Sequence, residues 1–251
     1  MERAAVRGRL TWLVAEVIEL IPETPRVMSI RLRVPGWTGH LPGQHVDLRL
    51  TAEDGYQAQR SYSIATPADG EMVTISVELV ANGEVSPYLF GELRVGDRIE
   101  LRGPIGGYFV WEPARGGPLQ LVGGGSGLVP LMAMARSLRE AGDGIPARML
   151  VSARTSEDVI YRDELARLPS ELPDLRIDYT LTRSQPSGWK GYGRRVDRAM
   201  LVEATFDADQ QPAIFVCGPT GFVETVAATL GEIGHQPERI RTERFGPTGG
   251  S

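Results

Sequence analysis

The sequence contains very few of the side chains that hold metal ions or form cross-links. Among its 251 residues there is one cysteine, Cys217, and there are three histidines. A single thiol excludes an internal disulfide, and it excludes an iron–sulfur cluster held by four cysteines of this chain. So few soft ligands also argue against a conventional zinc site, and we expect no metal centre.

Long apolar runs and an excess of positive charge are missing as well. The longest uncharged apolar stretch, Leu128 to Ala135, is far shorter than the roughly 20 residues that span a bilayer. The arginines at positions 3, 7 and 9 are not followed by an unbroken apolar run or a small-residue cleavage pattern, so we expect a cytoplasmic protein. A net charge of −5 argues against general nucleic-acid binding, which needs a basic surface.

The first half of the chain has an apolar period of two. In Met28 to Val34, apolar residues alternate with Ser29 and two arginines, and in Val73 to Leu79 they alternate with polar residues that include Ser76. This pattern is typical of strands with one buried and one polar face. The same alternation occurs in 46–50, and three more segments, 12–21, 60–65 and 97–102, are expected strands. Six strands at short spacing, 12–21, 28–34, 46–50, 60–65, 73–79 and 97–102, predict an antiparallel six-stranded Greek-key β-barrel.

The second half alternates strands with helices after a glycine- and proline-rich break at 113–118. Such alternation predicts an α/β domain with a parallel sheet and helices on both faces. We therefore divide the chain into domains at 1–113 and 114–251. The expected strands are 119–122, 149–152, 175–181 and 213–216, and the expected helices are 128–138, 162–168, 196–204 and 220–233, the first with Arg136 and Arg139 on its outer face.

A glycine-rich loop connects the first strand and helix of this second half. The loop consists of Gly123, Gly124, Gly125, Ser126 and Gly127. Glycines let a backbone approach a pyrophosphate closely, the helix N-terminus supplies free N–H groups, and Pro130 suits the first helical turn. Leu128 stands where a GxGxxG fingerprint has its third glycine, so a tight turn without a ligand is an alternative.

A second candidate site lies on the barrel strand that contains Arg60, Ser61, Tyr62 and Ser63. In an extended chain Arg60 and Tyr62 share one face, and the two serines share the other. An arginine can bind a phosphate, a tyrosine can pack on a flat ring system, and a hydroxyl can hydrogen-bond a ring nitrogen. The alternative is an ordinary barrel strand with a half-buried tyrosine.

Two further segments are close to expected strand ends. Cys217, Gly218 and Pro219 end the last clear parallel strand, at the carboxyl edge where open α/β sheets bind ligands. A lone cysteine is otherwise usually a small buried apolar residue. Glu243 and Phe245 lie in a segment that forms either a final edge strand or an exposed tail with an anchoring aromatic.

The order of these motifs resembles the ferredoxin–NADP reductase family. The motifs are Arg60-Ser-Tyr-Ser, Gly83-Glu-Val-Ser86, Gly103-Pro104, the glycine-rich loop and Cys217-Gly-Pro219, and the resemblance extends from Leu10 to Phe245. It implies a flavin-binding barrel followed by a nicotinamide-nucleotide domain, with the two rings meeting between them.

For the flavin, the resemblance implies that Arg60 binds a phosphate, Tyr62 packs on the isoalloxazine and Ser63 lies near N5. The segment Gly83, Glu84, Val85 and Ser86 would hold the pyrophosphate through N–H groups and the Ser86 hydroxyl, which favours FAD over FMN. Glu243 matches a carboxylate near the flavin, and Phe245 resembles the aromatic residue that covers it. Six residues follow Phe245, whereas the plant-type pattern ends at a tyrosine.

For the nucleotide, the resemblance implies that the loop at 123–127 faces the NAD(P) pyrophosphate and that Cys217 lies beside the nicotinamide. Ser152 and Arg154 end one strand of the second half, and Thr182 and Arg183 end the next. Thr182 and Arg183 resemble the Ser-Arg pair that family members use for a 2′-phosphate, and more arginines follow as far as Arg198. We therefore expect NADPH rather than NADH as the hydride donor.

The expected activity is that of an FAD-dependent NAD(P)H oxidoreductase that passes electrons to a separate ferredoxin or other redox protein. The single cysteine leaves no iron–sulfur centre of the chain's own to receive them. One alternative is a reductase of free flavin or a small oxidant. Another is a nucleotide-binding subunit without redox activity.

Overall fold

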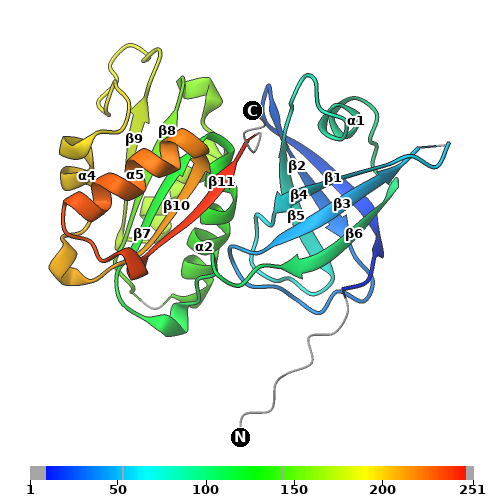
Figure 1. Cartoon of the computed structure of the whole chain (residues 1–251), viewed down its shortest axis with the longest axis horizontal. Coiled ribbons are helices and arrows are strands. Elements are labelled where there is room, and N and C mark those ends of the chain that lie inside the picture. Colours follow the sequence, from blue (N-terminus) through cyan, green and yellow to red (C-terminus); the bar gives the residue numbers. More distant parts are fainter. Residues whose placement is uncertain (1–9, 53, 143, 247–251) are drawn as a thin grey trace, which may run out of the picture.

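The first half of the chain folds into a six-stranded antiparallel sheet (Figure 1). The structure is a computed structural model, and it describes residues 10–52, 54–142 and 144–246, so the N-terminal arginines lie outside the described residues. The strand order is β4-β3-β6-β1-β2-β5, and the two outer strands meet through a bridge between Ile64 and Ile75. The predicted antiparallel barrel is therefore confirmed. Its strands are β1 (Leu13–Thr24), β2 (Val27–Arg33), β3 (His45–Thr51), β4 (Gln57–Ser63), β5 (Met72–Glu78) and β6 (Arg98–Ile105).

Three strands of the barrel differ by three residues at one end from the predicted bounds, and one of them is β6, which continues to Ile105. β1 continues to Thr24 through Pro22, which is paired with Met28 of β2, whereas the predicted strand ended at residue 21. The strand tolerates Pro22 because β1 pairs with β6 only over Leu13–Glu16, so the far end of β1 needs hydrogen bonds on one side alone. β4 begins at Gln57 and ends at Ser63, and a short helix, α1 (Ser86–Gly91), follows β5.

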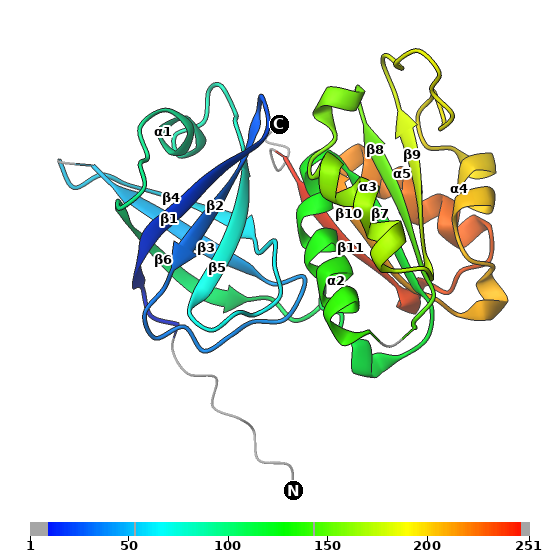
Figure 2. The same cartoon turned by 180° about the vertical axis from the view of Figure 1, so that it is seen from behind.

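The second half is a five-stranded parallel sheet in the order β11-β10-β7-β8-β9. Helices α2 (Leu128–Ala141) and α3 (Arg162–Glu171) cover one face, and α4 (Arg198–Ala204) and α5 (Thr220–Glu232) cover the other (Figures 1 and 2). This arrangement confirms the predicted α/β class. The strands are β7 (Leu119–Gly124), β8 (Ala147–Ala153), β9 (Leu175–Leu181), β10 (Ala213–Pro219) and β11 (Ile240–Phe245). β11 pairs in parallel with β10, so the segment with Glu243 and Phe245 is an edge strand and not a tail.

The two halves pack directly against each other. Val27, Ala65 and Phe109 of the first half belong to the same buried apolar cluster as the residues of α2. The Phe109 and Phe215 rings meet edge to face with centroids 5.2 Å apart, and Arg241 donates a hydrogen bond of 3.0 Å to the carbonyl of Val110. The relative position of the two sheets is therefore fixed by both apolar and polar contacts.

This packing overturns three expectations about exposure. Ser29 and Ser76 lie at positions predicted to be polar and outward-facing, yet their exposed fractions are 2% and 6%. Arg136 was expected on the outer face of its helix, but only 13% of its side chain is exposed. The reason is the same in each case, because the other half of the molecule covers the face that a single strand or helix would present to water.

No helix of the described residues is both long and apolar enough to cross a membrane. In the same part of the chain, no three histidine, cysteine, aspartate or glutamate side chains are grouped so that they could hold a metal ion.

Candidate functional site

A cleft of about 510 Å³ lies between the two halves, at the carboxyl ends of the parallel strands. Most of its wall comes from the second half, and the turn between β1 and β2 and the end of β5 supply the rest. The cleft brings together seven of the residues predicted for the nucleotide: Gly124, Gly125, Ser126, Ser152, Arg154, Thr182 and Pro219. Residues from four different strand ends thus meet at one place.

The glycine-rich loop connects β7 to α2 through one tight turn at Gly125–Gly127. Gly125 has a φ of +57°, a left-handed conformation that favours glycine. A Cβ atom on Gly127 would lie 2.1 Å from the carbonyl oxygen of Cys217, so only glycine fits there. Gly123, the first residue of the loop, is buried in β7, and Pro130 is buried in the first turn of α2. The loop therefore packs backbone to backbone on the segment that contains Cys217.

Cys217 itself does not line the cleft, because its side chain is fully buried. It is the register partner of Glu243 on β11, and its Sγ lies 3.9 Å from Glu243 Oε2. Burial raises the pKa of Cys217 well above its usual value, and the neighbouring carboxylate adds to this shift. Burial also raises the pKa of Glu243 to about 7. The pair thus forms a covered, weakly acidic site behind Gly218, whereas Pro219 reaches the cleft.

Phe245 ends β11 next to Pro219 and packs, partly buried, on the apolar cluster that joins the two halves. It lies outside the residues that line the cleft. Its predicted role as a cover for the flavin stays a prediction.

On the barrel, Arg60 is half exposed and its guanidinium lies 2.7 Å from a carboxylate oxygen of Glu84. The Tyr56 hydroxyl donates to the other oxygen of Glu84 at 2.7 Å. The hydrogen bonds from Tyr56 and Arg60 lower the pKa of Glu84, so this carboxylate is charged at neutral pH. The arginine predicted to bind a flavin phosphate is therefore paired with an acidic residue of the predicted pyrophosphate segment.

The three residues that follow Arg60 on β4 differ in how far their side chains are buried. Tyr62 packs, partly buried, on the barrel core, and burial raises its pKa to about 12. Ser63 is buried, whereas Ser61 is exposed and donates a hydrogen bond of 2.6 Å to Asp47. Ser61 therefore shares a face of the sheet with Asp47, its register partner on β3.

The segment Gly83–Ser86 turns from β5 into α1. The Ser86 hydroxyl, predicted to bind pyrophosphate, accepts a hydrogen bond of 3.0 Å from the N–H of Val80 and is buried. Val85 is buried, and Gly83 lies so close to Val80 and Ser86 that a Cβ atom would be 3.1 Å from both. In this structure Ser86 stabilises the turn itself.

The residues predicted for a 2′-phosphate are divided by the structure. Arg154 lines the cleft, as does Thr182, whose hydroxyl donates to the carbonyl of Ala153 at 3.3 Å. Arg183 is exposed and its N–H donates to the carbonyl of Arg154, but it is not part of the cleft wall. Arg195, from the arginine-rich stretch, lines the cleft instead.

Several lining residues were not predicted. Thr24, Arg26 and Val27 come from the β1–β2 turn, and Glu78 ends β5. No motif marks these positions, because they belong to the site only through the packing of one half on the other. Phe222 and Thr225, in the first turns of α5, could have been found from their position just after the Cys-Gly-Pro segment.

Comparisons with known proteins agree with this organisation. Residues 15–110 match the oxidoreductase FAD-binding domain, and residues 121–228 match the oxidoreductase NAD-binding domain. The reductase component of propane 2-monooxygenase from Mycolicibacterium goodii is 31% identical over 221 residues, which are 86% of this chain and 62% of that protein. The glycine betaine monooxygenase reductase subunit of Chromohalobacter salexigens is 33% identical, over 82% of this chain and 56% of that protein. This chain therefore spans about three fifths of the length of these relatives.

Solved structures show the same fold. A cytochrome P450 reductase from Amycolatopsis superposes with a TM-score of 0.83 and 28% identity, over 97% of this chain and 74% of that one. The ferredoxin reductase in carbazole 1,9a-dioxygenase superposes with a TM-score of 0.81 and 25% identity, over 94% of this chain and 69% of that one.

The matched domains, in this order around a shared cleft, define an FAD- and nicotinamide-nucleotide-binding oxidoreductase. The chain belongs to the ferredoxin–NADP reductase family, as the order of its motifs indicates.

Proposed function

We propose that the chain is an FAD-dependent reductase that takes a hydride from NADPH and passes electrons to a separate redox protein. The FAD-binding domain would cover residues 1–113 and the nucleotide domain residues 114–251. The observation that supports the proposal most directly is the cleft. The glycine-rich strand-to-helix loop and a turn of the barrel both line this one cleft of about 510 Å³. The names of the relatives, reductase components of monooxygenases, support a separate protein as electron acceptor.

The residues present fit both cofactors. For FAD, the exposed guanidinium of Arg60 can bind a phosphate, and at Gly83 an added Cβ atom would be only 3.1 Å from Val80 and Ser86, so a glycine suits this tight turn. For the nucleotide, the loop at 123–127 is followed by the 14-residue helix α2, whose N-terminus attracts a pyrophosphate. When bound, FAD supplies the redox chemistry, accepting two electrons as a hydride and releasing them singly.

The protein's own part in the reaction is to bind, orient and exclude water. Arg60 and Ser86 would hold the FAD phosphates, Tyr62 would pack on the flavin, and Ser63 would hydrogen-bond it. On the other side, Gly124 to Ser126 would hold the nucleotide in the cleft. The buried Cys217, together with the partly buried Glu243, would help to close the site from behind. Orientation of this kind is a large part of what an enzyme contributes to hydride transfer.

The preference for NADPH rests on arginines in the cleft wall and beside it. Arg154 and Arg195 line the cleft, and neither forms an ion pair with any carboxylate in the described part of the chain. A free guanidinium beside the nucleotide pocket favours a ligand with an additional phosphate, because bidentate arginine contacts match phosphate geometry. Arg183 lies just outside and can reach a ligand that protrudes from the cleft.

The test is anaerobic reduction of the purified, FAD-loaded protein by NADPH and, in a separate sample, by NADH. Arg195→Ala and Arg183→Ala are expected to lower the efficiency with NADPH about 10- to 100-fold, the effect of losing a charge-assisted hydrogen bond, and to change that with NADH much less. Arg167→Ala, which removes an exposed arginine of α3, is the matched control.

Equal efficiencies with both nucleotides in the wild type, or equal losses in the two arginine variants, would contradict the NADPH assignment. A bound flavin that neither nucleotide reduces would contradict the reductase itself and favour a subunit without redox activity. Rapid turnover with free flavin or a small oxidant, and none with a redox protein, would replace the proposed acceptor.

A further inference from the structure

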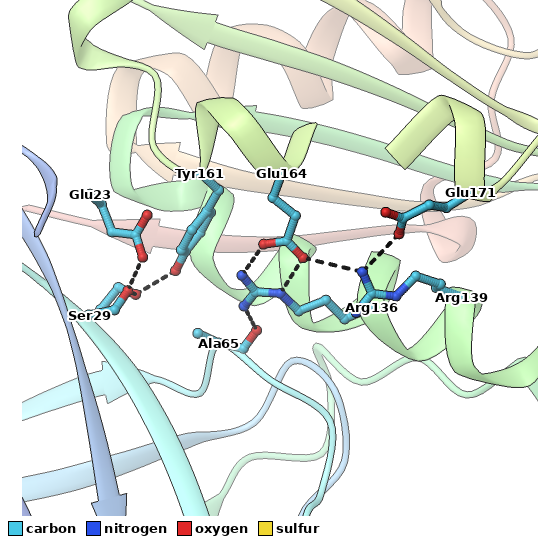
Figure 3. A network of polar contacts seen from close by, with 9 residues as sticks. Glu23, Ser29, Ala65, Arg136, Arg139, Tyr161, Glu164 and Glu171 are labelled. Atoms are coloured by element: carbon cyan, nitrogen blue, oxygen red, sulfur yellow. Dashed lines mark hydrogen bonds and ion pairs between the residues drawn. The ribbon is translucent and has the colours of Figure 1, made fainter. Parts of the chain in front are cut away.

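A chain of buried and partly buried polar groups crosses the interface between the two halves, and none of its members lines the cleft (Figure 3). We call it the interface cluster. Its members are Glu23, Ser29 and Ser76 from the barrel, and Arg136, Tyr161 and Glu164 from the nucleotide half.

The hydroxyl groups of the cluster are hydrogen-bonded in one line. Ser29 Oγ donates to Glu23 at 2.6 Å, Ser29 and Ser76 are 2.7 Å apart, and Ser76 in turn bonds the Tyr161 hydroxyl. Because each hydroxyl has one hydrogen, a carboxylate at Glu23 sets the direction of the line from Tyr161 through the two serines to Glu23. Each of the two serine hydroxyls then both donates and accepts, as buried polar groups require.

Tyr161 is held in a conformation that tyrosine rarely adopts. It precedes α3 with a φ of 58°, and its exposed fraction is 4%. A bulky residue in the left-handed region is strained, and such strain persists only where the surroundings hold it. In this case the surroundings include the other half of the molecule, because the tyrosine's hydroxyl bonds Ser76 of β5 and its ring lies 4.7 Å from the Arg136 guanidinium.

Arg136 connects the two cofactor segments. It lies on α2, the helix that begins at the glycine-rich loop, and it makes two hydrogen bonds to Glu164. Its remaining nitrogen donates to the carbonyl oxygen of Ala65 at 2.6 Å. Ala65 follows Ser63 by two residues, so a single planar guanidinium joins the nucleotide helix to the end of the strand predicted to hold the flavin (Figure 3).

We propose that Arg136 and Tyr161 are positioning residues for hydride transfer. Through Ala65 and Ser76 they fix the distance between the flavin strand, residues 60–63, and the nucleotide loop, residues 123–127. This inference rests on the proposed function, because it concerns the geometry of the same reaction. Neither residue touches the cleft, so their effect acts through the relative position of the two halves.

The physical reason is the steep dependence of the reaction on distance. Reacting atoms must approach to about 3–3.5 Å, and a misplacement of about 1 Å can cost roughly 100-fold in rate. Apolar packing between the halves, as at Phe109 and Phe215, is driven by a force that has little direction. The directional bonds of the interface cluster restrict sliding of one half on the other.

The test uses FAD-loaded protein carrying Tyr161→Phe or Arg136→Lys. Phenylalanine keeps the ring and loses the bond to Ser76, and lysine keeps a charge near Glu164 but cannot bond Glu164 and Ala65 with a planar fork. Arg139→Lys is the matched control, because Arg139 lies on the same helix and both of its ion pairs, with Glu171 at 3.1 Å and with Glu164 at 3.8 Å, stay inside the nucleotide half.

Stopped-flow reduction separates positioning from binding. Each interface variant is expected to lower the limiting rate of flavin reduction about 10- to 100-fold. The nucleotide concentration at half-maximal rate and the FAD content are expected to change less than about twofold, as for a lost orientation rather than a lost contact. Arg139→Lys is expected to keep the wild-type rate. Unchanged limiting rates in both variants would overturn the proposal, even if their melting temperatures fell.

A second readout does not depend on hydride transfer. Spin labels on Val95→Cys and Val202→Cys, two exposed positions in different halves, report the distance between the halves. The wild type is expected to give one narrow distance distribution, and both interface variants a broader or shifted one. An unchanged distribution would overturn the proposal. If the wild type is reduced by neither nucleotide, the proposed function fails, and the distance measurement still decides whether the cluster sets the position of the halves.

Discussion

Cys217 and Glu243 are register partners on adjacent parallel strands, and the thiol sulfur lies 3.9 Å from a carboxyl oxygen. Burial at the carboxyl edge of the sheet raises the pKa of both groups, and the Glu243 carboxylate raises the pKa of the thiol further. Glu243 consequently changes protonation near pH 7, whereas Cys217 stays a neutral thiol. The pair thus offers one titrating group at the predicted site within the physiological range.

The raised pKa of Glu243 makes stability depend on pH. An unfolded glutamate loses its proton near pH 4.5, and the folded one near pH 7. Between these values the native state holds an additional proton, so the free energy of unfolding falls as pH rises, by up to about 3 kcal/mol, and no further above pH 7. We expect urea unfolding at pH 5 and pH 8 to show this loss in the wild type and not in Glu243→Gln.

The comparison of the wild type with Glu243→Gln separates the effect of Glu243 on stability from the effects of other titrating groups. Burial lowers the pKa values of His40, His45 and His235, which acts in the opposite direction and is present in both proteins. A wild type and a Glu243→Gln variant with parallel pH profiles would show that the carboxyl ionises normally.

Cys217 is expected to resist thiol reagents in the native protein. The thiolate is the reactive form, and both burial and a raised pKa remove it. At pH 8, iodoacetamide is expected to modify the native chain only as fast as it unfolds, and to modify one thiol per chain rapidly in concentrated urea. Rapid labelling without urea, measured by mass spectrometry, would contradict the covered geometry.

Gly127 allows the glycine-rich loop to pack on the Cys217 segment, and Gly127→Ala tests this contact. The added Cβ would meet backbone atoms of Cys217 at 2.1 and 2.4 Å, which cannot move aside like a side chain. We expect a loss of about 1–3 kcal/mol or more, typical of overpacking, and weaker nucleotide binding. Gly231→Ala, in α5 with no atom within 4 Å of its Cβ, is expected to gain roughly 0.5–1 kcal/mol. Chemical unfolding of both variants measures the difference.

Local sequence patterns were sufficient to predict most strands and helices of each half. The alternation in Met28 to Val34 and the glycine-rich loop before Leu128 each reflect the neighbouring chain, and the structure contains β2 and α2 at those places. The same holds for the family, because the order of motifs along the chain is a property of the sequence alone.

What sequence could not supply is the packing of one half on the other. Ser29 and Ser76 read as outward-facing residues of two strands, but they are buried opposite Tyr161, which lies more than 80 residues further along the chain. The contact of Cys217 with Glu243 depends on the register of two strands joined by a helix. Contacts of this kind depend on tertiary geometry, and one sequence contains no periodic signal for them.

The ion pair between Arg60 and Glu84 is expected to influence the affinity for FAD. A phosphate that binds Arg60 must share it with the Glu84 carboxylate or displace it. Arg60→Ala is expected to weaken FAD binding about 10- to 100-fold, through loss of a charged hydrogen bond. Glu84→Gln is expected to tighten FAD binding by up to about fivefold, because an exposed ion pair contributes less than about 1 kcal/mol.

Glu92→Gln, which removes an equal charge at the end of α1, is the control and is expected to leave the FAD affinity unchanged. Titration of FAD-free protein by fluorescence measures all three, and an equal affinity of Glu84→Gln and the wild type would show that the carboxylate does not compete for Arg60.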